Sequence, residues 1–378
     1  MNNIKVCHFT CAHDDNDVRI FSKECKSLHE AGYDVYLVAP GNREIRVENG
    51  IKIINVKVSR NPLMRVLSSS RKVYKKALEL NANIYHFHDI ELFWYGIKLK
   101  RKGYKVIFDS HEDWIGYIND IKWLPSVVKY LFVKYIKYKY KIKLNKFDAV
   151  ITVSPHIVDS LKINTPNVFL VTNYPTINNG DMNQVNYAKY LDREKIICYA
   201  GTVYENSNQD KILYAIQNIE EIKYWVVGDI SQAYKERIVG LDFKNKILFI
   251  DRVSKPELIN IYNKVIVGVV LFDYSKNCGG TKGTMGNNKI FEYMMSGLPI
   301  ICTDFEDWKE LIVDKYNCGI CVAPDNIIEL ENAINKLIQD KSLAYEMGQN
   351  GQRAVLEEFN WSTQERVLLN IYEKILIN

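Results

Sequence analysis

Short apolar runs alternate with helical segments along this 378-residue chain, and this alternation limits its fold more than any other feature. Runs such as 4–9, 35–39 and 300–303 are too short for buried helices and show no regular polar alternation. They are typical of strands buried on both faces of a parallel sheet, with helices as the crossover connections. The chain is therefore predicted to be an α/β protein with doubly wound sheets.

The pattern runs twice, which together with the length predicts two domains. A polar stretch at 176–193 separates the two series of strands and reads as the connection. We expect a Rossmann-like N-terminal domain at 1–175, a Rossmann-like C-terminal domain at 176–358, and a last helix at 359–378 that returns to the first domain. Ligands of open α/β sheets bind outside the carboxyl ends of the strands, so a cleft where the domains face each other is the expected site.

Composition excludes several classes of protein. The net charge of +5 is mild and no nucleic-acid-binding motif accompanies it, so no nucleic-acid partner is expected. No apolar run approaches the roughly 20 residues of a membrane span, and residues 1–7 lead straight into a strand without a signal peptide. The eight cysteines are scattered, several within apolar runs, as in cytosolic proteins with free thiols. Cys318 and Cys321 have no second pair at zinc spacing, so no metal site is expected there.

A glycine-rich loop at 278–286 leads into a short helix that begins near Asn287 and stops at Gly297. Backbone N–H groups of such a loop can approach a phosphate, and the helix N-terminus adds roughly half a positive charge. Lys289 can neutralise a diphosphate, and Glu292 can accept hydrogen bonds from ribose hydroxyls. These residues predict a nucleotide-diphosphate site. The alternative is an ordinary strand–loop–helix unit capped by Asn287 and Gly297.

Five segments in order carry a family resemblance. They are HDDNDVRIFSKE at 13–24, YHFHD at 85–89, FDSHED at 108–113, NKIFEYMMSGLPII at 288–301 and EEFNWSTQERVLLNIYEKIL at 357–376. With Gly201 at the end of a strand, they make nearly the whole chain similar to the retaining family 4 glycosyltransferases of the GT-B fold, in the branch that builds bacterial surface polysaccharides.

The resemblance implies a reaction and its partners. A UDP- or GDP-sugar would bind mainly on the C-terminal domain, and a glycan or polyprenyl-linked oligosaccharide acceptor would bind on the N-terminal domain. Transfer would retain the anomeric configuration with no metal and no cofactor, because a helix N-terminus and basic side chains neutralise the leaving diphosphate. In agreement, the chain has no clustered carboxylates like a metal-binding Asp-x-Asp.

The resemblance also assigns roles to residues. His111 would reach the donor sugar, Lys289 would neutralise the diphosphate, and Glu292 would hold the ribose; these three are the expected catalytic residues. The other residues expected around the donor are Gly201, Thr202, Arg252, Gly283, Thr284, Met285, Gly286, Asn287 and Asn288.

The acceptor side is expected on the N-terminal domain. His13, Asp17 and Arg19 lie on its first loop, where the family places the acceptor. His88 and Asp89 are the other acceptor candidates, with a purely structural pair as the alternative. We expect His86 and His88 to point to opposite faces of their strand, so that at most one of them faces the acceptor.

Two departures from the family pattern stand out. Thr284 occupies the position of the first Glu of the family's Glu-x7-Glu motif. Thr202 and Ser207 occupy the positions of the usual Arg and Lys on the diphosphate, so Lys289, Arg252 or Lys211 would have to substitute. The alternative function is therefore a catalytically silent partner subunit that binds a nucleotide sugar. A sugar-nucleotide epimerase on the same fold is a third option, but no residue favours it.

The helix predicted at 124–144 interleaves lysines with tyrosines and phenylalanine. Basic residues with amphipathic aromatics suit an anionic membrane surface. The alternative is a solvated lysine-rich helix whose tyrosines pack inward. We expect a cytoplasmic protein that is peripheral on the inner face of the cell membrane.

Overall fold

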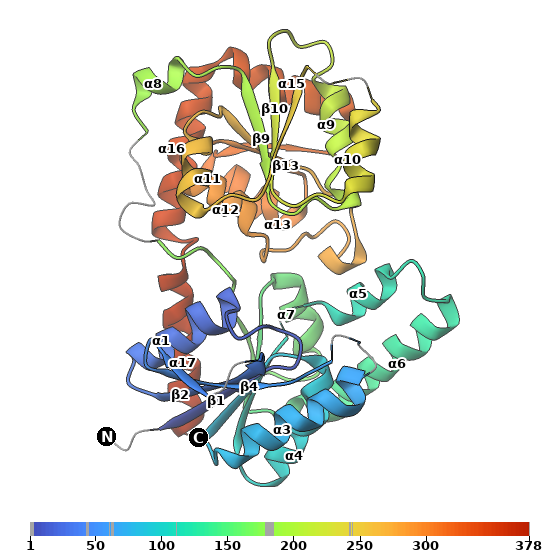
Figure 1. Cartoon of the computed structure of the whole chain (residues 1–378), viewed down its shortest axis with the longest axis vertical. Coiled ribbons are helices and arrows are strands. Elements are labelled where there is room, and N and C mark those ends of the chain that lie inside the picture. Colours follow the sequence, from blue (N-terminus) through green and yellow to red (C-terminus); the bar gives the residue numbers. More distant parts are fainter. Residues whose placement is uncertain are drawn as a thin grey trace. The chain divides into compact units, whose positions relative to one another are not determined.

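The computed structural model describes residues 4–42, 45–59, 61, 64–110, 112–177, 185–241, 243 and 245–377. The chain divides into two compact units (Figure 1), one formed by Met1–Asn173 with Trp361–Asn378 and the other by Tyr174–Asn360. Each unit has its own predominantly parallel sheet covered by helices. The predicted α/β class with two doubly wound domains is confirmed.

In the described residues, the N-terminal unit holds an eight-stranded sheet of order β3-β4-β2-β1-β5-β6-β7-β8. Its strands are β1 (Lys5–Phe9), β2 (Asp34–Pro40), β3 (Arg46–Glu48), β4 (Ile51–Val56), β5 (Ile84–Phe87), β6 (Lys105–Asp109), β7 (Ala149–Thr152) and β8 (Val168–Leu170). All pairings are parallel except β3 with β4, which is antiparallel. The sequence pattern did not predict β3, because this edge strand is short and polar.

Helices cover both faces of this sheet. They are η1 (Val18–Cys25), α1 (Lys26–Glu30), η2 (Arg65–Ser69), α3 (Ser70–Glu79), η3 (Ile90–Leu92), α4 (Phe93–Arg101), α5 (Trp114–Asp120), α6 (Ser126–Lys143), η4 (Leu144–Lys146), α7 (Pro155–Lys162) and α17 (Trp361–Ile377). One face of the sheet packs on η1, α1 and α17. The other packs on α3, α4, α6 and α7. Strand residues alternate between these two apolar layers, as the period of two requires.

The last helix, α17, belongs to the N-terminal unit although it follows the C-terminal unit in sequence (Figure 1). Leu368, Ile371 and Tyr372 on its inner side are buried against that sheet. Trp361 at its start donates a hydrogen bond from Nε1 to Ser27 Oγ at 2.9 Å. The amphipathic spacing of α17 thus fits a helix that covers one sheet face.

The C-terminal unit has a six-stranded parallel sheet of order β11-β10-β9-β12-β13-β14 in its described residues. The strands are β9 (Ile196–Ala200), β10 (Lys223–Val227), β11 (Ile247–Ile250), β12 (Val267–Val270), β13 (Ile300–Thr303) and β14 (Gly319–Val322). The helices are α8 (Tyr187–Leu191), η5 (Glu205–Ser207), α9 (Gln209–Ala215), α10 (Gln232–Val239), α11 (Lys255–Tyr262), η6 (Lys276–Cys278), α12 (Asn288–Met295), α13 (Glu306–Trp308), η7 (Lys309–Val313), α14 (Asp314–Tyr316), α15 (Ile327–Gln339) and α16 (Lys341–Glu357).

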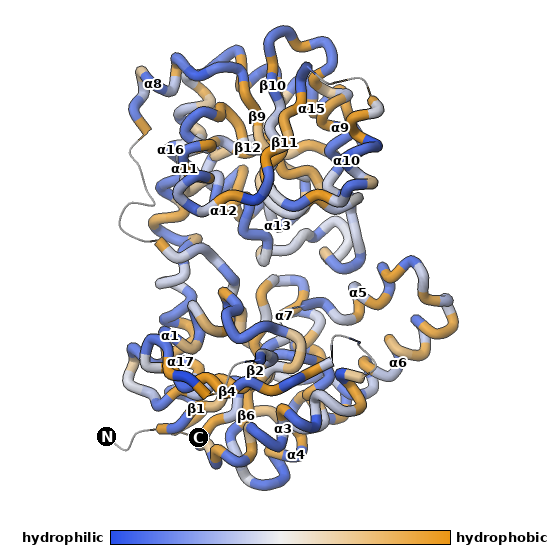
Figure 2. The backbone as a smooth tube through the Cα atoms, viewed as in Figure 1, coloured by the Kyte–Doolittle hydropathy of each residue, from blue (hydrophilic) through white to orange (hydrophobic). Residues whose placement is uncertain are grey.

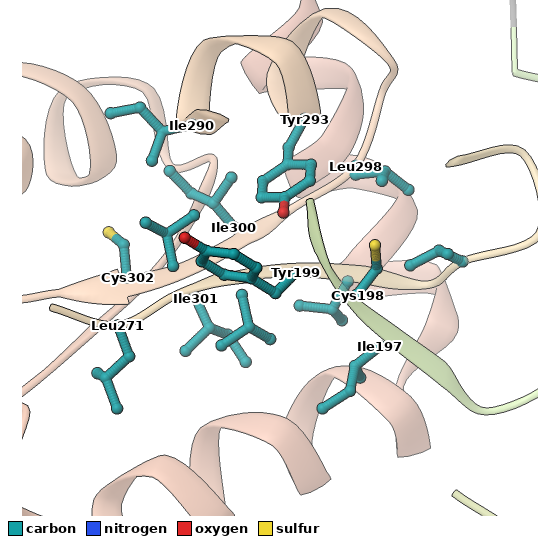
Figure 3. Close-up of a cluster of buried hydrophobic side chains, with 14 of the residues drawn as sticks. Ile197, Cys198, Tyr199, Leu271, Ile290, Tyr293, Leu298, Ile300, Ile301 and Cys302 are labelled. Carbon is teal, nitrogen blue, oxygen red and sulfur yellow. The ribbon is translucent and has the colours of Figure 1, made fainter. Parts of the chain in front are cut away.

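The strands form the hydrophobic interior of each unit (Figure 2). In the C-terminal unit, Tyr293 of α12 points into the core beside Tyr199 of β9 and Ile300 of β13 (Figure 3). All eight cysteines are free thiols, and six of them are buried, as expected for thiols in apolar strands and helices.

Candidate functional site

The glycine-rich loop enters α12 as the sequence predicted. Asn287 is the N-cap, and its side-chain oxygen accepts a hydrogen bond from the N–H of Lys289 at 3.1 Å. The helix ends before Gly297, whose φ of +69° allows the left-handed turn. Met285 in the loop is buried in the core, so only its backbone can face a ligand.

Contacts with the following segment fix the loop. Trp308 Nε1 donates to the carbonyl oxygen of Thr284 at 2.9 Å, and the N–H of Gly286 donates to Thr284 Oγ1 at 3.2 Å. A β-carbon on Gly283 would fall 2.5 Å from Phe305 Cβ, and its φ is +86°. Thr284, which replaces the family's first Glu, therefore helps to shape the loop through both its backbone and its hydroxyl.

The carboxyl ends of β9 and β10 come unusually close together. Gly201 follows β9 with φ +135°, and Gly228 follows β10 with φ +123°. A β-carbon on Gly228 would lie 2.6 Å from the carbonyl oxygen of Gly201. Tyr293 OH accepts a hydrogen bond from the N–H of Ala200 at 2.6 Å and thereby ties α12 to the end of β9.

Lys289 lies against this glycine turn. A β-carbon on Gly201 would fall 2.3 Å from Lys289 Cε and 3.1 Å from Nζ. The ammonium is 5.7 Å from the ring centroids of both Tyr199 and Phe272, and no carboxylate of a described residue lies within 4.0 Å of it. Burial lowers the pKa of Lys289, and the charge of Glu292 opposes this. A cation is thus held at the edge of the sheet without an ion-pair partner among the described residues.

The other expected donor residues take different places. Glu292 is half-buried on the same helix, one turn after Lys289. Thr202 is exposed, and its carbonyl accepts a hydrogen bond from Tyr199 OH at 2.8 Å. Ser207 is fully buried and accepts from the N–H of Tyr204 at 2.9 Å, so it stabilises a turn where the family has a Lys.

The three cations that could bind the diphosphate, Arg252, Lys211 and Lys289, differ in exposure and in their carboxylate partners. Arg252 is 81% exposed, and its nearest carboxylate is Asp229 at 3.8 Å. Lys211 is held by Asp273 at 3.1 Å and Asp325 at 2.6 Å. Of the three, Lys289 is the residue whose ammonium lies at the glycine turn and has no carboxylate of a described residue within 4.0 Å.

In the N-terminal unit, His13 and Asp17 are both partly exposed. His13 Nδ1 is 3.5 Å from Asp17 Oδ2, and Nε2 is 3.5 Å from Asp89 Oδ1. Asp89 is buried and accepts hydrogen bonds from Thr10 Oγ1 at 2.9 Å and the N–H of Cys11 at 2.5 Å. Burial lowers the pKa of His13, but hydrogen bonding to Asp17 and the charges of both aspartates outweigh it and raise the pKa to about 8.

Arg19 does not lie on the first loop, and that expectation is wrong. It stands in the first turn of η1, buried at 5% exposure. Its Nε and Nη2 donate to the two carboxylate oxygens of Asp109 at 3.0 and 3.3 Å, and Nη1 donates to the carbonyl of Val171 at 2.9 Å. Nε also lies 3.0 Å from Glu24 Oε1. The guanidinium of Arg19 therefore binds partners in the interior of the unit and does not face an acceptor.

His88 is buried in the same polar cluster. Its Nδ1 is 3.3 Å from Asp109 Oδ2, and its Nε2 is 3.0 Å from His8 Nδ1. The expectation that His86 and His88 diverge is also wrong, because side chains two residues apart along a strand share a face. Their ring centroids are 4.7 Å apart. Tyr372 OH of α17 is 2.9 Å from His86 Nδ1 and 3.2 Å from His8 Nε2.

His111 lies outside the described residues. The residues around it are described: Ser110 is buried after β6, and Asp113 caps α5 by accepting from the N–H groups of Ile115 and Gly116 at 3.1 and 3.0 Å. The sequence analysis missed His8, Glu24 and Tyr372 as members of the buried cluster. His8 could have been found from the sequence, because it is a polar residue within an otherwise apolar strand.

Comparisons with known proteins identify this fold. The model of the family described as "Glycosyl transferases group 1" matches residues 187–354, and the model of "Glycosyltransferase Family 4" matches residues 21–166. The chain is 22% identical over 376 residues to an uncharacterized glycosyltransferase of Methanocaldococcus jannaschii, covering 92% of this chain and 91% of that protein.

Solved structures agree along the whole chain. Sucrose-phosphate synthase from Thermosynechococcus elongatus is similar at a TM-score of 0.76, with 17% identity and 99% of both chains covered. The Anabaena protein HepE in complex with UDP and glucose is similar at a TM-score of 0.70, with 14% identity and 98% and 99% covered. The two units therefore have the GT-B architecture, and the matches support glycosyltransferase activity.

Proposed function

We propose that this GT-B chain is a retaining glycosyltransferase that moves a sugar from a UDP- or GDP-sugar to a glycan acceptor, lipid-linked, in the assembly of a surface polysaccharide. The donor binds on the C-terminal unit beside α12, and the acceptor on the N-terminal unit near His13 and Asp17. Support comes from the two family models, one on each unit, and from a structural relative with bound UDP and glucose.

One observation carries the proposal: the Lys289 ammonium lies against Gly201 with no carboxylate of the described chain beside it. Placing a cation in a partly buried position costs free energy unless an anion compensates it. A diphosphate provides that anion, and the N-terminus of α12 and the backbone of the glycine turn add further positive potential. Lys289 thus takes the role that the family gives to the Arg and Lys replaced here by Thr202 and Ser207.

The chemistry follows from this placement. The bond between the anomeric carbon and the diphosphate oxygen breaks, and negative charge develops on the leaving diphosphate. Lys289 and the N-terminus of α12 stabilise this charge, so that no divalent ion is needed. The acceptor hydroxyl attacks from the face that the diphosphate leaves and gives its proton to the departing diphosphate oxygen, which retains the anomeric configuration. Glu292 holds the ribose, and His111 bonds a hydroxyl of the transferred sugar.

Nucleotide binding and turnover test the donor site. Thermal shifts with UDP, GDP, ADP and CMP identify the base, and release of free nucleotide from a sugar nucleotide reports transfer. Replacing Lys289 by Ala should weaken binding of the preferred diphosphate roughly 10- to 150-fold, the value of one charge-assisted hydrogen bond. Glu292→Ala should weaken nucleoside binding. EDTA should leave the rate unchanged.

Lys282→Ala is the matched control. Lys282 is an exposed lysine of the same loop, paired with Glu306. Equal nucleotide affinity in Lys289→Ala, Lys282→Ala and the unchanged chain would reject the placement of the diphosphate.

Helix α6 supports the membrane part of the proposal. Five large apolar side chains at helical spacing form an exposed stripe: Val127, Tyr130, Leu131, Tyr135 and Tyr138. Figure 2 shows hydrophobic stretches along this helix. The exposed lysines 134, 137 and 141 accompany the stripe. An exposed apolar stripe with flanking lysines suits the headgroup region of an anionic bilayer. In the described residues, no helix combines the length and the apolar character needed to cross a membrane.

Sedimentation with vesicles tests this surface. Leu131→Glu should reduce binding to vesicles that contain phosphatidylglycerol. Ile163→Glu, at another exposed apolar position of the same unit, should not. Equal binding to anionic and zwitterionic vesicles, or no binding, would reject the proposal that the protein binds an anionic membrane.

The second candidate is a catalytically silent partner subunit that binds a nucleotide sugar. It is favoured by Ser207, which is buried in a turn where the family has a basic residue. Nucleotide binding without turnover across a broad acceptor panel would select this function over transfer.

A further inference from the structure

We propose that His8, Glu24, His86 and His88 form a binding site for one divalent transition-metal ion inside the N-terminal unit. These four side chains come from β1, η1, and the end of β5, and none is more than 1% exposed. One ligand atom from each can be chosen so that all four atoms lie within 4.8 Å of one another. The cluster belongs to the N-terminal unit, whereas the proposed donor site belongs to the C-terminal unit. The expectation of metal-free transfer concerns the leaving diphosphate and not this cluster.

The far side of each imidazole is anchored by a hydrogen-bond partner. Tyr372 OH is 2.9 Å from Nδ1 of His86 and 3.2 Å from Nε2 of His8. Asp109 Oδ2 is 3.3 Å from Nδ1 of His88. This leaves His8 Nδ1, His86 Nε2 and His88 Nε2 as the ligand atoms. Histidines that bind metals have this arrangement, in which the second ring nitrogen is held by a carboxylate or another polar group that fixes the ring.

The remaining atoms are spaced as ligands of one ion. His8 Nδ1 is 3.0 Å from His88 Nε2 and 3.9 Å from Glu24 Oε2. Ligands about 2.1 Å from a tetrahedral ion are roughly 3.4 Å apart, so small side-chain shifts would suffice. The three ring centroids are 4.4, 4.7 and 5.3 Å from one another, so each imidazole lies next to the other two.

Two buried groups of the cluster lack partners that an ion would supply. His86 Nε2 and both carboxylate oxygens of Glu24 accept no hydrogen bond from a described nitrogen donor. The charged groups beside Glu24 are Arg19, whose Nε lies 3.0 Å from Oε1, and the carboxyl group of Asp109. Arg19 instead directs its two-pronged hydrogen bond at Asp109. Leaving buried acceptors unsatisfied is costly, and a cation coordinated by Glu24 and His86 removes that cost.

The chemistry of the four donor groups indicates which ion the site would hold. Three imidazoles and one carboxylate suit Zn²⁺ among the common divalent ions. With four protein ligands and no exposed face, the ion would be structural and would join β1, η1 and β5, and α17 through Tyr372.

Metal content and stability test the site without any activity assay. The full chain is unfolded, freed of metal with a chelator, and refolded with Zn²⁺, with Co²⁺ or with chelator alone. We expect one zinc per chain by mass spectrometry of the elements, the visible absorption of tetrahedral Co²⁺, and a higher Tm with Zn²⁺ than with chelator. Glu24→Gln and His86→Gln should abolish all three signals, while His29→Gln, a histidine outside the cluster, should keep them.

Two results would overturn the proposal. One is an unchanged chain that retains neither zinc nor cobalt after refolding with these ions. The other is an equal Tm after refolding with Zn²⁺ and with chelator. Either result would make the cluster a network of neutral side chains that share protons. Because the unchanged chain is measured directly, a variant that fails to fold does not affect the outcome, and nucleotide binding by the C-terminal unit is read independently.

Discussion

The Lys289 side chain lies directly against the α-carbon of Gly201, so that a β-carbon added there would fall 2.3 Å from Lys289 Cε. The two residues are far apart in sequence, one after β9 and the other in the first turn of α12. Their contact requires a residue without a side chain at the end of the strand. It places a half-buried cation where the carboxyl ends of the parallel strands meet.

Gly201→Ala should displace Lys289 and strain the backbone, whose φ of +135° is unfavourable for alanine. We expect nucleotide affinity to fall about as far as in Lys289→Ala and stability to fall by roughly 1–3 kcal/mol. Titration calorimetry with the preferred nucleotide and urea unfolding measure the two effects. Gly240→Ala is the control, because its β-carbon would meet only two carbonyl oxygens at 3.4 Å. If Gly201→Ala bound nucleotide normally, the contact would have no part in donor binding.

Tyr293→Phe removes the hydroxyl that accepts a hydrogen bond from the N–H of Ala200 at 2.6 Å. Both groups are buried, so the N–H would be left unsatisfied, and we expect a loss of about 1–3 kcal/mol in the free energy of unfolding. Tyr345→Phe provides the comparison, since its hydroxyl bonds the carbonyl of Val185 in a partly buried position and its loss should cost less. Equal stability of Tyr293→Phe and the unchanged chain would show that the bond does not hold α12 on β9.

His13 should titrate with a pKa of about 8, raised by Asp17 and Asp89 against the opposing effect of burial. A folded-state pKa above the usual 6.5 means that protonated His13 stabilises the fold. This stabilisation is complete below pH 6.5 and is lost as the pH rises through about 8. It amounts to at most about 2 kcal/mol, because the side chain is 27% exposed and water screens the pairs.

Titration by NMR measures the pKa of His13 directly. Asp17→Asn should lower it, since the largest raising contribution is the hydrogen bond to Asp17. Asp34 lies at the start of β2, at the end of the sheet opposite to His13. Asp34→Asn should therefore leave the pKa of His13 unchanged. A pKa of His13 at the usual value in the unchanged chain would contradict the geometry of the two carboxylates.

Lys139 of α6 is buried, unlike the neighbouring lysines 134, 137 and 141. Its ammonium lies 4.7 Å from the ring centroid of Phe93, and burial lowers its pKa to about 8, with Glu91 opposing. The folded-state pKa is below the usual 10.5, so the charge destabilises the fold. The penalty is complete below about pH 8 and disappears as the pH rises toward 10.5.

Lys139→Met should therefore stabilise the chain at neutral pH by about 1–3 kcal/mol, after allowance for the lost cation–π contacts. Urea unfolding below and above the pKa should show the gain shrinking as the pH rises. Lys137→Met, an exposed neighbour, should change stability little. A gain that does not depend on pH would mean that packing, and not charge, accounts for it.

Much of the fold was predictable because its signals are local. The apolar runs 196–200 and 300–303 coincide with β9 and β13, since a buried parallel strand needs a short continuous apolar segment. Asn287 and Gly297 marked the two ends of α12 through capping chemistry. In contrast, α5, α7 and the edge strand β3 were missed, because segments of seven, eight and three residues are too short to show a clear hydrophobic period.

The candidate sites were predictable only in part. Lys289 and Glu292 could be named from their spacing after a glycine-rich loop. The burial of Arg19 could not be predicted from the sequence, because its partner Asp109 lies on β6 and its partner Glu24 lies on the next turn of η1. The sequence analysis placed His86 and His88 on opposite faces of a strand and did not consider His8, since His8 and His86 become neighbours only when β1 pairs with β5.

The sequence by itself determined the two α/β units, the glycine-rich loop and the residues able to bind a phosphate, because strand length, capping and turn chemistry act over a few neighbouring residues. Tertiary structure alone decided which cation lies at the glycine turn and which polar side chains are buried together. Those outcomes depend on the parallel register of strands and on α17 packing against the first unit, and such contacts join residues that are distant along the chain.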